Sequence, residues 1–587
     1  MKAIFSAEAS LIILLLALHL VIFFGGMTNM EEWSYYLGAR SLAENRDLDL
    51  GDDYYASGLK ALIEKKAALK EMRENVPLPG EIYNPATQPA PTEPAVQGNE
   101  GETTAAAAAA PAAPEAVPEM FSLEDTFPID PKSLPSASEG VGRGTHVAPG
   151  AFFTDAPFYL LGRWIAQTCP IKIPVGNFFF DGLSADESTK ATMVLAGHMV
   201  MSILATILLF VAFTSLDFGR IPSAIASVLI FFGTPIAAYG GSGFNQAPSA
   251  LALALVLIAI VRLAKADEMD EEGSHYITIF ILGVLVGAAA VIRYANALVL
   301  VGLIFYFILS RKSWLNLVFR SLVLLVGFSA LAWFVPYWWK MTYGHYIPPC
   351  FDQMYSFWHC VKSIPLRKVL LLQRNGLFLF APIMLLALAG AIHLGITRRN
   401  NPQAWRTMVV VLFTFFLTAF VVDSYIGWNG GGFSSRLMTG VSLLAGLGVA
   451  HLMSESFNKW FAYVVSFLAA LYSYTLFVIY HSSLFPGWVS GYPDAGQNID
   501  HYKYLFMNEY SYMRPDISGR IFQKSYVIRE LIASGRLDIL VGAMIVLMIL
   551  LHIVLMRMER RKIELELREK KKILAQAYAA GYKRRGV

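Results

Sequence analysis

Two adjacent carboxylates, Glu31 and Glu32, stand in the stretch NMEEWSYY, directly after the first long apolar run of the chain. A partly desolvated carboxylate can take a proton from an incoming hydroxyl, which predicts a general base. The alternative is a pair of first-turn acids that complement the N-terminus of a helix. On a helix, Glu31 lies beside Tyr35 and Glu32 beside Tyr36, so at most one carboxylate faces a given site. Glu31 is the predicted base, and Glu32 is the alternative.

Basic side chains stand at the ends of several later apolar runs. Arg293 lies between two such runs in AAAVIRYANALVL, a costly position in a membrane unless a partner neutralises it. The alternative is an arginine whose side chain reaches back to the interface. Arginine and lysine both suit phosphate oxygens. A phosphate-bearing ligand is therefore predicted to bind a set of four cations: Arg293, Arg374, Arg436 and Lys340.

Other polar and aromatic residues accompany these charges. The triple glycine of DSYIGWNGGGFSSR lets the backbone approach a ligand closely, and Trp428 offers a flat face of the kind that stacks on sugars. The alternative for this stretch is a tight turn between helices with interfacial aromatics. The predicted substrate-binding residues are Tyr35, Tyr36, His146, Asn296, His345, Trp428 and Asn429.

A D-x-D sequence, Asp47-Leu-Asp49, is followed by Asp52 and Asp53. Such carboxylates can hold a divalent cation, but hard-cation sites need about six or more oxygen ligands. A polar turn is therefore the favoured interpretation. No metal ligand is assigned and no cofactor is predicted, with a divalent cation as the alternative.

The composition places these residues in a membrane protein. The chain of 587 residues is 55% hydrophobic and only 16% charged, with a mean hydropathy of +0.48. Soluble domains carry about 25% charged residues. The net charge of +3 is small and indicates no particular partner. This composition excludes a soluble enzyme and a nucleic-acid-binding protein.

Long apolar runs predict an all-α integral membrane protein with about twelve transmembrane helices, since a hydrocarbon core about 30 Å thick requires about 20 apolar residues per helix. The first run is long for a signal peptide and lacks a cleavage site of the A-x-A type, so an uncleaved helix is expected. The predicted spans are 9–26, 190–213, 221–240, 247–264, 276–293, 295–310, 314–336, 376–396, 405–422, 437–453, 458–480 and 538–556.

Basic residues in the short loops orient these spans. With the N-terminus and the C-terminus both inside, the cytoplasmic loops carry Arg220, Arg262, Lys265, Arg311, Lys312, Arg398, Arg399, Arg406 and Lys459. The long loops, and with them the predicted site, then face the periplasm or the exterior. A multi-pass protein of a cell membrane, expected to be a bacterial inner membrane, follows from this arrangement.

The predicted domain organisation follows the same pattern. The Pro/Ala-rich insertion in the first loop cannot bury a core and is expected to be disordered. The segments are a first transmembrane helix (1–26), an extracytoplasmic loop with interfacial helices (27–189) that contains the insertion (77–139), helices two to seven (190–336), an outer loop (337–375), helices eight to eleven (376–480), an outer loop (481–537), a last helix (538–556) and a basic cytoplasmic tail (557–587).

The order of these motifs resembles the GT-C superfamily of polytopic membrane glycosyltransferases, in particular its protein O-mannosyltransferase and lipid A aminoarabinose transferase type. The segments that carry the resemblance are EEWSYYLGARSL (31–42), HVAPGAFFTDAPFYLLG (146–162), GVLVGAAAVIRYANAL (283–298), RNGLFLFAPIMLL (374–386) and GWNGGGFSSRLM (427–438). Glu31 stands where that family commonly has Asp. The Pro/Ala-rich insertion is foreign to the family pattern.

The resemblance implies an enzyme that takes a sugar from a polyprenyl-phosphate-linked donor. It implies an extracytoplasmic acceptor, which is a glycan, a lipid or a protein, and an inverting displacement at the sugar. The alternative is a polytopic transporter or flippase for a lipid-linked or anionic substrate, and Pro235 and Pro248 around YGGSGFNQA are its best feature. A non-catalytic scaffold is a third interpretation, but it leaves the outer charges unexplained.

Overall fold

The computed structural model describes residues 7–22, 30–44, 148–168, 185–269, 274–310, 313–343, 346, 366–371, 376–397, 401–424, 434–456, 458–481, 567 and 571. Within them all regular structure is helical, which confirms the all-α prediction for this part of the chain. The helices are α1 (Ala7–Ile22), α2 (Met30–Glu44), α6 (Gly150–Thr168), α7 (Ala185–Ser215), α8 (Arg220–Gly233), α9 (Ile236–Tyr239), α10 (Gln246–Met269), α11 (Ser274–Ile292), η4 (Tyr294–Ala297), α12 (Leu298–Leu309), α13 (Trp314–Ala332), α14 (Phe334–Tyr343), α16 (Arg367–Leu371), α17 (Leu377–Phe380), α18 (Ile383–Ile396), α19 (Pro402–Ser424), η6 (Arg436–Met438), α20 (Thr439–Glu455) and α21 (Lys459–His481).

Seven of the described helical segments are long and apolar enough to cross a membrane, and four shorter apolar helices accompany them. These segments coincide with the predicted spans between 9–26 and 458–480. The last predicted span, 538–556, lies outside the described residues, so the count of twelve stays a prediction. The bundle has the helix content and apolar lengths of a multi-pass membrane protein.

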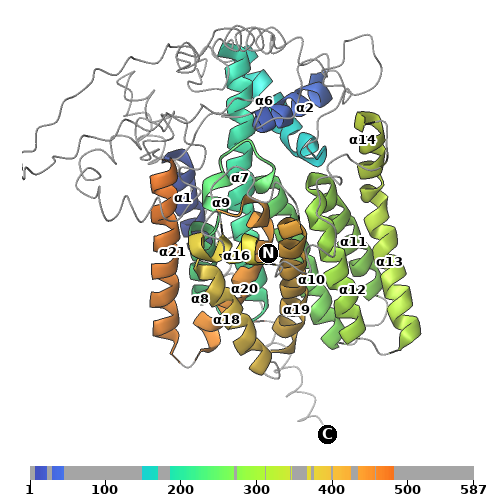
Figure 1. Cartoon of the computed structure of the whole chain (residues 1–587), viewed down its shortest axis with the longest axis vertical. Coiled ribbons are helices and arrows are strands. Elements are labelled where there is room, and N and C mark those ends of the chain that lie inside the picture. The colour runs from blue at the N-terminus through green and yellow to red at the C-terminus, as the bar shows by residue number, and fades with distance from the viewer. Residues whose placement is uncertain are drawn as a thin grey trace, which may run out of the picture.

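The helices differ in how deeply they lie in the bundle. α20 is 89% buried over its span, whereas the spans of α13 with α14 and of α21 are only 28% buried. Figure 1 shows α21 and α13 at opposite sides of the bundle, with α20 between them. A helix that is apolar on all sides is buried, and the sequence TGVSLLAGLGVAHLMSE of α20 follows that rule.

Small residues let neighbouring helices approach closely. A methyl group added at Gly390 of α18 would lie 2.0 Å from the carbonyl oxygen of Gly448 in α20. α11 and α13 meet in the same way, because a Cβ at Gly327 would lie 2.3 Å from the carbonyl of Phe280. Such contacts let membrane helices gain packing energy where the surrounding lipid offers little hydrophobic driving force.

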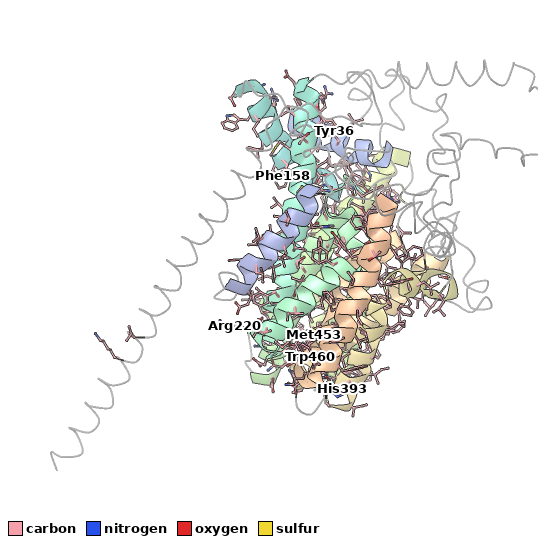
Figure 2. All side chains as sticks on the ribbon, turned by 90° about the vertical axis from the view of Figure 1, so that its left-hand side faces the viewer. Tyr36, Phe158, Arg220, His393, Met453 and Trp460 are labelled. Atoms are coloured by element: carbon pink, nitrogen blue, oxygen red, sulfur yellow. The ribbon has the colours of Figure 1, made fainter. Side chains whose placement is uncertain are left out.

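α2 and α6 lie together at one end of the bundle, beside the end of α7 (Figure 1). Both fall in the predicted first outer loop. Gly38 of α2 packs on the ring of Phe152 in α6, where an added Cβ would lie 2.4 Å from the ring. In Figure 2, Tyr36 lies at one end of the molecule, and Arg220 and Trp460 lie toward the other. The two ends that the loop charges assign to opposite sides of the membrane are therefore the two ends of the bundle.

Candidate functional site

The loop between α9 and α10, residues 240–245, contacts three parts of the chain that are distant in sequence. The carbonyl of Ser242 lies 2.6 Å from His198 Nδ1 of α7. The ring of Phe244 lies 4.3 Å below the guanidinium carbon of Arg436. Asn245 Nδ2 donates to the carbonyl of Ile292, at the end of α11. This stretch, here called the hub loop, lies within the glycine-rich segment YGGSGFNQA of the sequence.

Arg293 follows α11 in an extended conformation, with φ at −156°. Its side chain is only 8% exposed, and Nη2 donates to the carbonyl oxygen of Leu437 over 2.7 Å. The guanidinium therefore points into the protein and does not reach back to water. A buried arginine is costly unless its donors are used, so this position holds a fixed positive charge inside the predicted outer end of the bundle.

Arg436 begins η6, the turn that contains the acceptor of Arg293. Ser434 just before it adopts a left-handed backbone with φ at 55°, and the backbone N–H of Arg436 donates to the Ser434 carbonyl over 2.9 Å. This turn directs Arg436 over the face of Phe244, a cation–π contact that helps a partly buried guanidinium. The structure thus brings two of the four predicted cations, Arg293 and Arg436, to one turn.

Asn296, a predicted substrate-binding residue, is 3% exposed. Its Nδ2 donates to Ser249 Oγ and to the carbonyl of Ala289, each over 2.9 Å. The side-chain amide ties η4 to both α10 and α11. Asn296 therefore lies beside Arg293 and supports the turn that presents it.

A buried carboxylate–imidazole pair contacts the hub loop through His198. Neither residue was among the predicted site residues. Asp155 Oδ1 of α6 is 2.9 Å from His198 Nε2 of α7, and both side chains are fully buried. Asp155 belongs to HVAPGAFFTDAPFYLLG, one of the segments that carry the family resemblance. A polar pair in an apolar surrounding was the available signal, but nothing local relates two residues on separate helices.

Tyr35 and Tyr36, predicted to bind substrate, face different neighbours. Tyr35 is buried in a cluster with Phe152 and Trp338. The centre of the Phe152 ring lies 6.3 Å from that of Tyr35 and 5.7 Å from that of Trp338. Tyr36 is also buried, and its hydroxyl donates to Glu187 Oε1 over 2.5 Å. Burial and the Glu187 carboxylate raise the pKa of Tyr36 well above its ordinary value.

Tyr36 belongs to a network, here called the α2 clamp, that fixes α2 on α6 and α7. Lys190 bridges Glu187 over 3.0 Å and Glu44 over 3.5 Å. The hydroxyl of Tyr159 donates to Glu44 Oε1 over 2.6 Å. Burial opposes ionisation of Glu44, but this hydrogen bond and the nearby Lys190 and Arg40 charges lower its pKa. The members of the α2 clamp are Tyr36, Arg40, Glu44, Tyr159, Glu187 and Lys190.

Lys340, the third predicted cation that the structure describes, lies apart from the two arginines. It is exposed on α14, and its Nζ donates to the hydroxyl of Tyr346 over 2.9 Å. Two residues earlier, Trp338 is buried against Phe152. α14 thus reaches the layer of α2 and α6, but no described contact joins Lys340 to Arg293 or Arg436.

Several predicted site residues lie outside the side chains that the structure describes. Glu31 and Glu32 fall in the first turn of α2, as predicted for their backbone, and their side chains are not described. The others are Arg374, His146, His345, Trp428 and Asn429. Among the described residues, no group of three or more His, Cys, Asp or Glu side chains is arranged to hold a metal, and Asp47 and Asp49 lie beyond them.

α6 connects α2 to the two arginines. Gly150, the first residue of α6, packs on the end of α11, where an added Cβ would lie 2.4 Å from the backbone nitrogen of Ile292. Ile292 immediately precedes Arg293. The helix that carries Glu31 and Glu32 is therefore separated from the arginine pair by a single helix.

A search among curated proteins finds no match to this chain. A family comparison does find one, over residues 172–339. This region runs from the approach to α7 into α14, so it contains His198, the hub loop and Arg293 but neither α2 nor Arg436. The matched family is that of the dolichyl-phosphate-mannose-protein mannosyltransferases, and the match confirms the resemblance of this chain to GT-C superfamily membrane glycosyltransferases.

Proposed function

We propose that this protein transfers a sugar from a polyprenyl-phosphate-linked donor to an acceptor hydroxyl on the extracytoplasmic side of the membrane. The observation that carries the proposal is the convergence of Arg293 and Arg436 on one turn, inside the bundle end where α2 and α6 lie. Two partly buried guanidinium groups at one place suit a phosphate, which is the group that the donor releases.

The proposed reaction is a direct displacement. The acceptor oxygen attacks the anomeric carbon of the sugar while the bond from that carbon to the phosphate oxygen breaks. The acceptor proton passes to Glu31, or to Glu32 if Glu31 is not the base, and polyprenyl phosphate leaves with both electrons of the broken bond. The attack and the departure occur on opposite faces, so the anomeric configuration inverts.

Each partner in this reaction has a physical reason. A carboxylate that is partly desolvated at a membrane interface can take the proton of an acceptor hydroxyl, which is the role proposed for Glu31. Fixed positive charges stabilise the phosphate as its negative charge increases, and they are more effective where water is excluded. The apolar helices flank the site and offer a surface that suits a prenyl chain.

Transfer by the purified protein tests the proposal. The protein in detergent or liposomes is given polyprenyl-phosphate-mannose with candidate glycan, lipid and peptide acceptors, and products are identified by mass spectrometry. Surface glycans and glycolipids of cells with and without the protein provide the unbiased comparison. A covalently modified acceptor with inverted configuration supports the proposal. Translocation of the lipid-linked sugar across liposomes without any transfer would overturn it in favour of a flippase.

A further inference from the structure

The neighbours of the Asp155–His198 pair fix how many protons the pair carries. The carbonyl of Ser242 can only accept, so His198 Nδ1, 2.6 Å away, carries a hydrogen. The remaining contact, from His198 Nε2 to Asp155 Oδ1 over 2.9 Å, then contains one proton between the two groups. Whichever atom holds it, the pair has no net charge. That neutrality explains how both side chains tolerate complete burial.

One of the two carboxylate oxygens of Asp155 is not used in the pair. Asp155 Oδ1 receives His198 and also the hydroxyl of Thr154 over 3.2 Å, whereas Asp155 Oδ2 is buried with no hydrogen-bond partner. A buried carboxylate oxygen without a hydrogen-bond donor destabilises the fold, because the water it loses on burial is not replaced. An unpaired buried polar atom calls for an explanation, and a hydroxyl hydrogen of a ligand is a donor that suits a carboxylate oxygen.

The pair is attached to the arginine site through the hub loop. Ser242, which anchors His198, stands two residues before Phe244, which lies under Arg436. On the other side, Asp155 stands one helical turn after Phe152, the residue on which α2 packs through Gly38. The carboxylate therefore lies in the layer between the helix of the proposed base and the loop that contacts the phosphate-binding arginine.

From these contacts we infer that Asp155 Oδ2 accepts a hydrogen bond from a hydroxyl of the sugar being transferred, and that His198 is its positioning residue. The inference rests on the proposed function, because it places a sugar next to the two arginines. In this arrangement the arginines recognise the phosphate and the pair recognises the sugar. The two halves of the donor are then bound by separate residues, and binding experiments can separate them.

Binding of two lipids provides the test. The probes are polyprenyl-phosphate-mannose and polyprenyl phosphate without sugar, and affinity is measured by titration calorimetry on the purified full-length protein. Asp155→Asn and His198→Leu are each expected to weaken binding of the mannose-bearing lipid by about tenfold or more, the loss for a hydrogen bond to a charged group. Binding of the sugar-free lipid should stay unchanged in both. Arg293→Ala, in contrast, should weaken both lipids.

Conservative and neighbouring variants separate positioning from folding. Gln places an amide donor where histidine has Nε2, so His198→Gln should recover most of the affinity lost in His198→Leu. Ser202→Ala removes a hydrogen bond from the next turn of α7 to the hub loop at Gly240, and it should not change the ratio of the two affinities. A thermal unfolding temperature close to that of the wild type confirms the fold of each variant. If Asp155→Asn fails to fold, the pair of variants at His198 decides.

Three results would overturn the inference. The first is an equal loss of affinity for both lipids in the Asp155 and His198 variants, and the second is no loss for either. The third is a wild-type protein that binds both lipids equally well. A wild-type protein that binds neither lipid contradicts the proposed function itself, which is a distinct outcome.

Discussion

The guanidinium of Arg293 donates to the carbonyl of Leu437 across 144 residues of sequence, over 2.7 Å. This hydrogen bond fixes the end of α11 against the turn that begins with Arg436. This contact brings together Arg293 and Arg436, two residues that were each predicted to bind a phosphate. The same contact means that Arg293 both carries a charge and positions a second charge.

Replacement of Arg293 by Ala should reduce affinity for polyprenyl phosphate by about tenfold or more, because it removes one buried charge and frees the turn of Arg436. Arg436→Ala should reduce affinity to a similar extent. Lipid binding by titration calorimetry measures both effects. Arg262→Ala, an exposed arginine at the predicted cytoplasmic end of α10, is the matched control and should bind normally. Unchanged affinity for polyprenyl phosphate in both Arg293→Ala and Arg436→Ala would show that these arginines do not bind the phosphate.

Replacement of Glu31 by Gln should lower the rate of sugar transfer by about 10²- to 10⁴-fold, the usual contribution of a general base. Donor affinity should stay close to that of the wild type, since the proposed role is proton transfer. Steady-state transfer and separate donor binding measure the two quantities. Glu32→Gln is the matched variant one position along α2. A fully active Glu31→Gln protein would move the base assignment to Glu32.

The contact between α18 and α20 should not tolerate a methyl group. An added Cβ at Gly448 would lie 2.0 Å from the carbonyl oxygen of Ala387, so Gly448→Ala must force the helices apart at a cost of about 1–3 kcal/mol. The expected result is a lower thermal unfolding temperature. Gly241→Ala is the control, because its Cβ would meet only side-chain atoms at 3.5 Å or more. Equal stability of the two variants would contradict this packing.

Docking of α2 should weaken in acid. The pKa of Glu44 is lowered in the folded protein, so its contribution to stability is present above the ordinary carboxyl pKa of about 4.3 and is lost as pH falls through the lowered value. The difference in unfolding temperature between the wild type and Glu44→Gln should therefore be largest near pH 7 and shrink below about pH 4. A difference that stays constant over this range would show that Glu44 does not act through its charge.

Removing both members of the ion pair Arg320–Asp267 should destabilise the protein less than removing the arginine alone. Arg320 Nη2 of α13 lies 2.5 Å from Asp267 Oδ1 of α10, and the hydroxyl of Tyr306 in α12 donates to Asp267 Oδ2. Arg320→Ala should destabilise the fold by about 3 kcal/mol, because the Asp267 side chain is only 10% exposed and would keep Tyr306 and His275 but lose its arginine. The double variant Arg320→Met with Asp267→Asn should cost less. If the loss of unfolding free energy in the double variant equals the sum of the losses in the Arg320 and Asp267 single variants, the two residues are not coupled.

The spans of the fold were predictable from sequence because lipid satisfies no backbone hydrogen bond. Every crossing segment must therefore form a helix of apolar residues. The helical first turn that holds Glu31 and Glu32 was also predictable, and it belongs to α2, which begins at Met30. Arg293 and Arg436 were each predictable as candidate site residues, since an arginine at the outer end of an apolar run is unusual.

The neighbours of these residues could not be predicted. Hydropathy reports which face of a helix avoids water but not which helix covers it, because lipid and protein interiors are equally apolar. The joining of Arg293 to Leu437 depends on how the end of α11 meets η6, and the pairing of Asp155 with His198 depends on α6 lying on α7. In the sequence alone, YGGSGFNQA favours a transporter, and only the fold relates this segment to Arg293 and Arg436.

By itself, then, the sequence determined that this is a helical membrane protein, where the described spans lie and which single residues are costly unless paired. Those properties follow from local composition and from the transfer of each side chain between water and lipid. Only the tertiary structure decided that two arginines share one turn, that Tyr36 is held by Glu187 and that a buried carboxylate lies behind the hub loop. Those relations arise from contacts between helices far apart in the chain, where close backbone approach at small residues selects the partners.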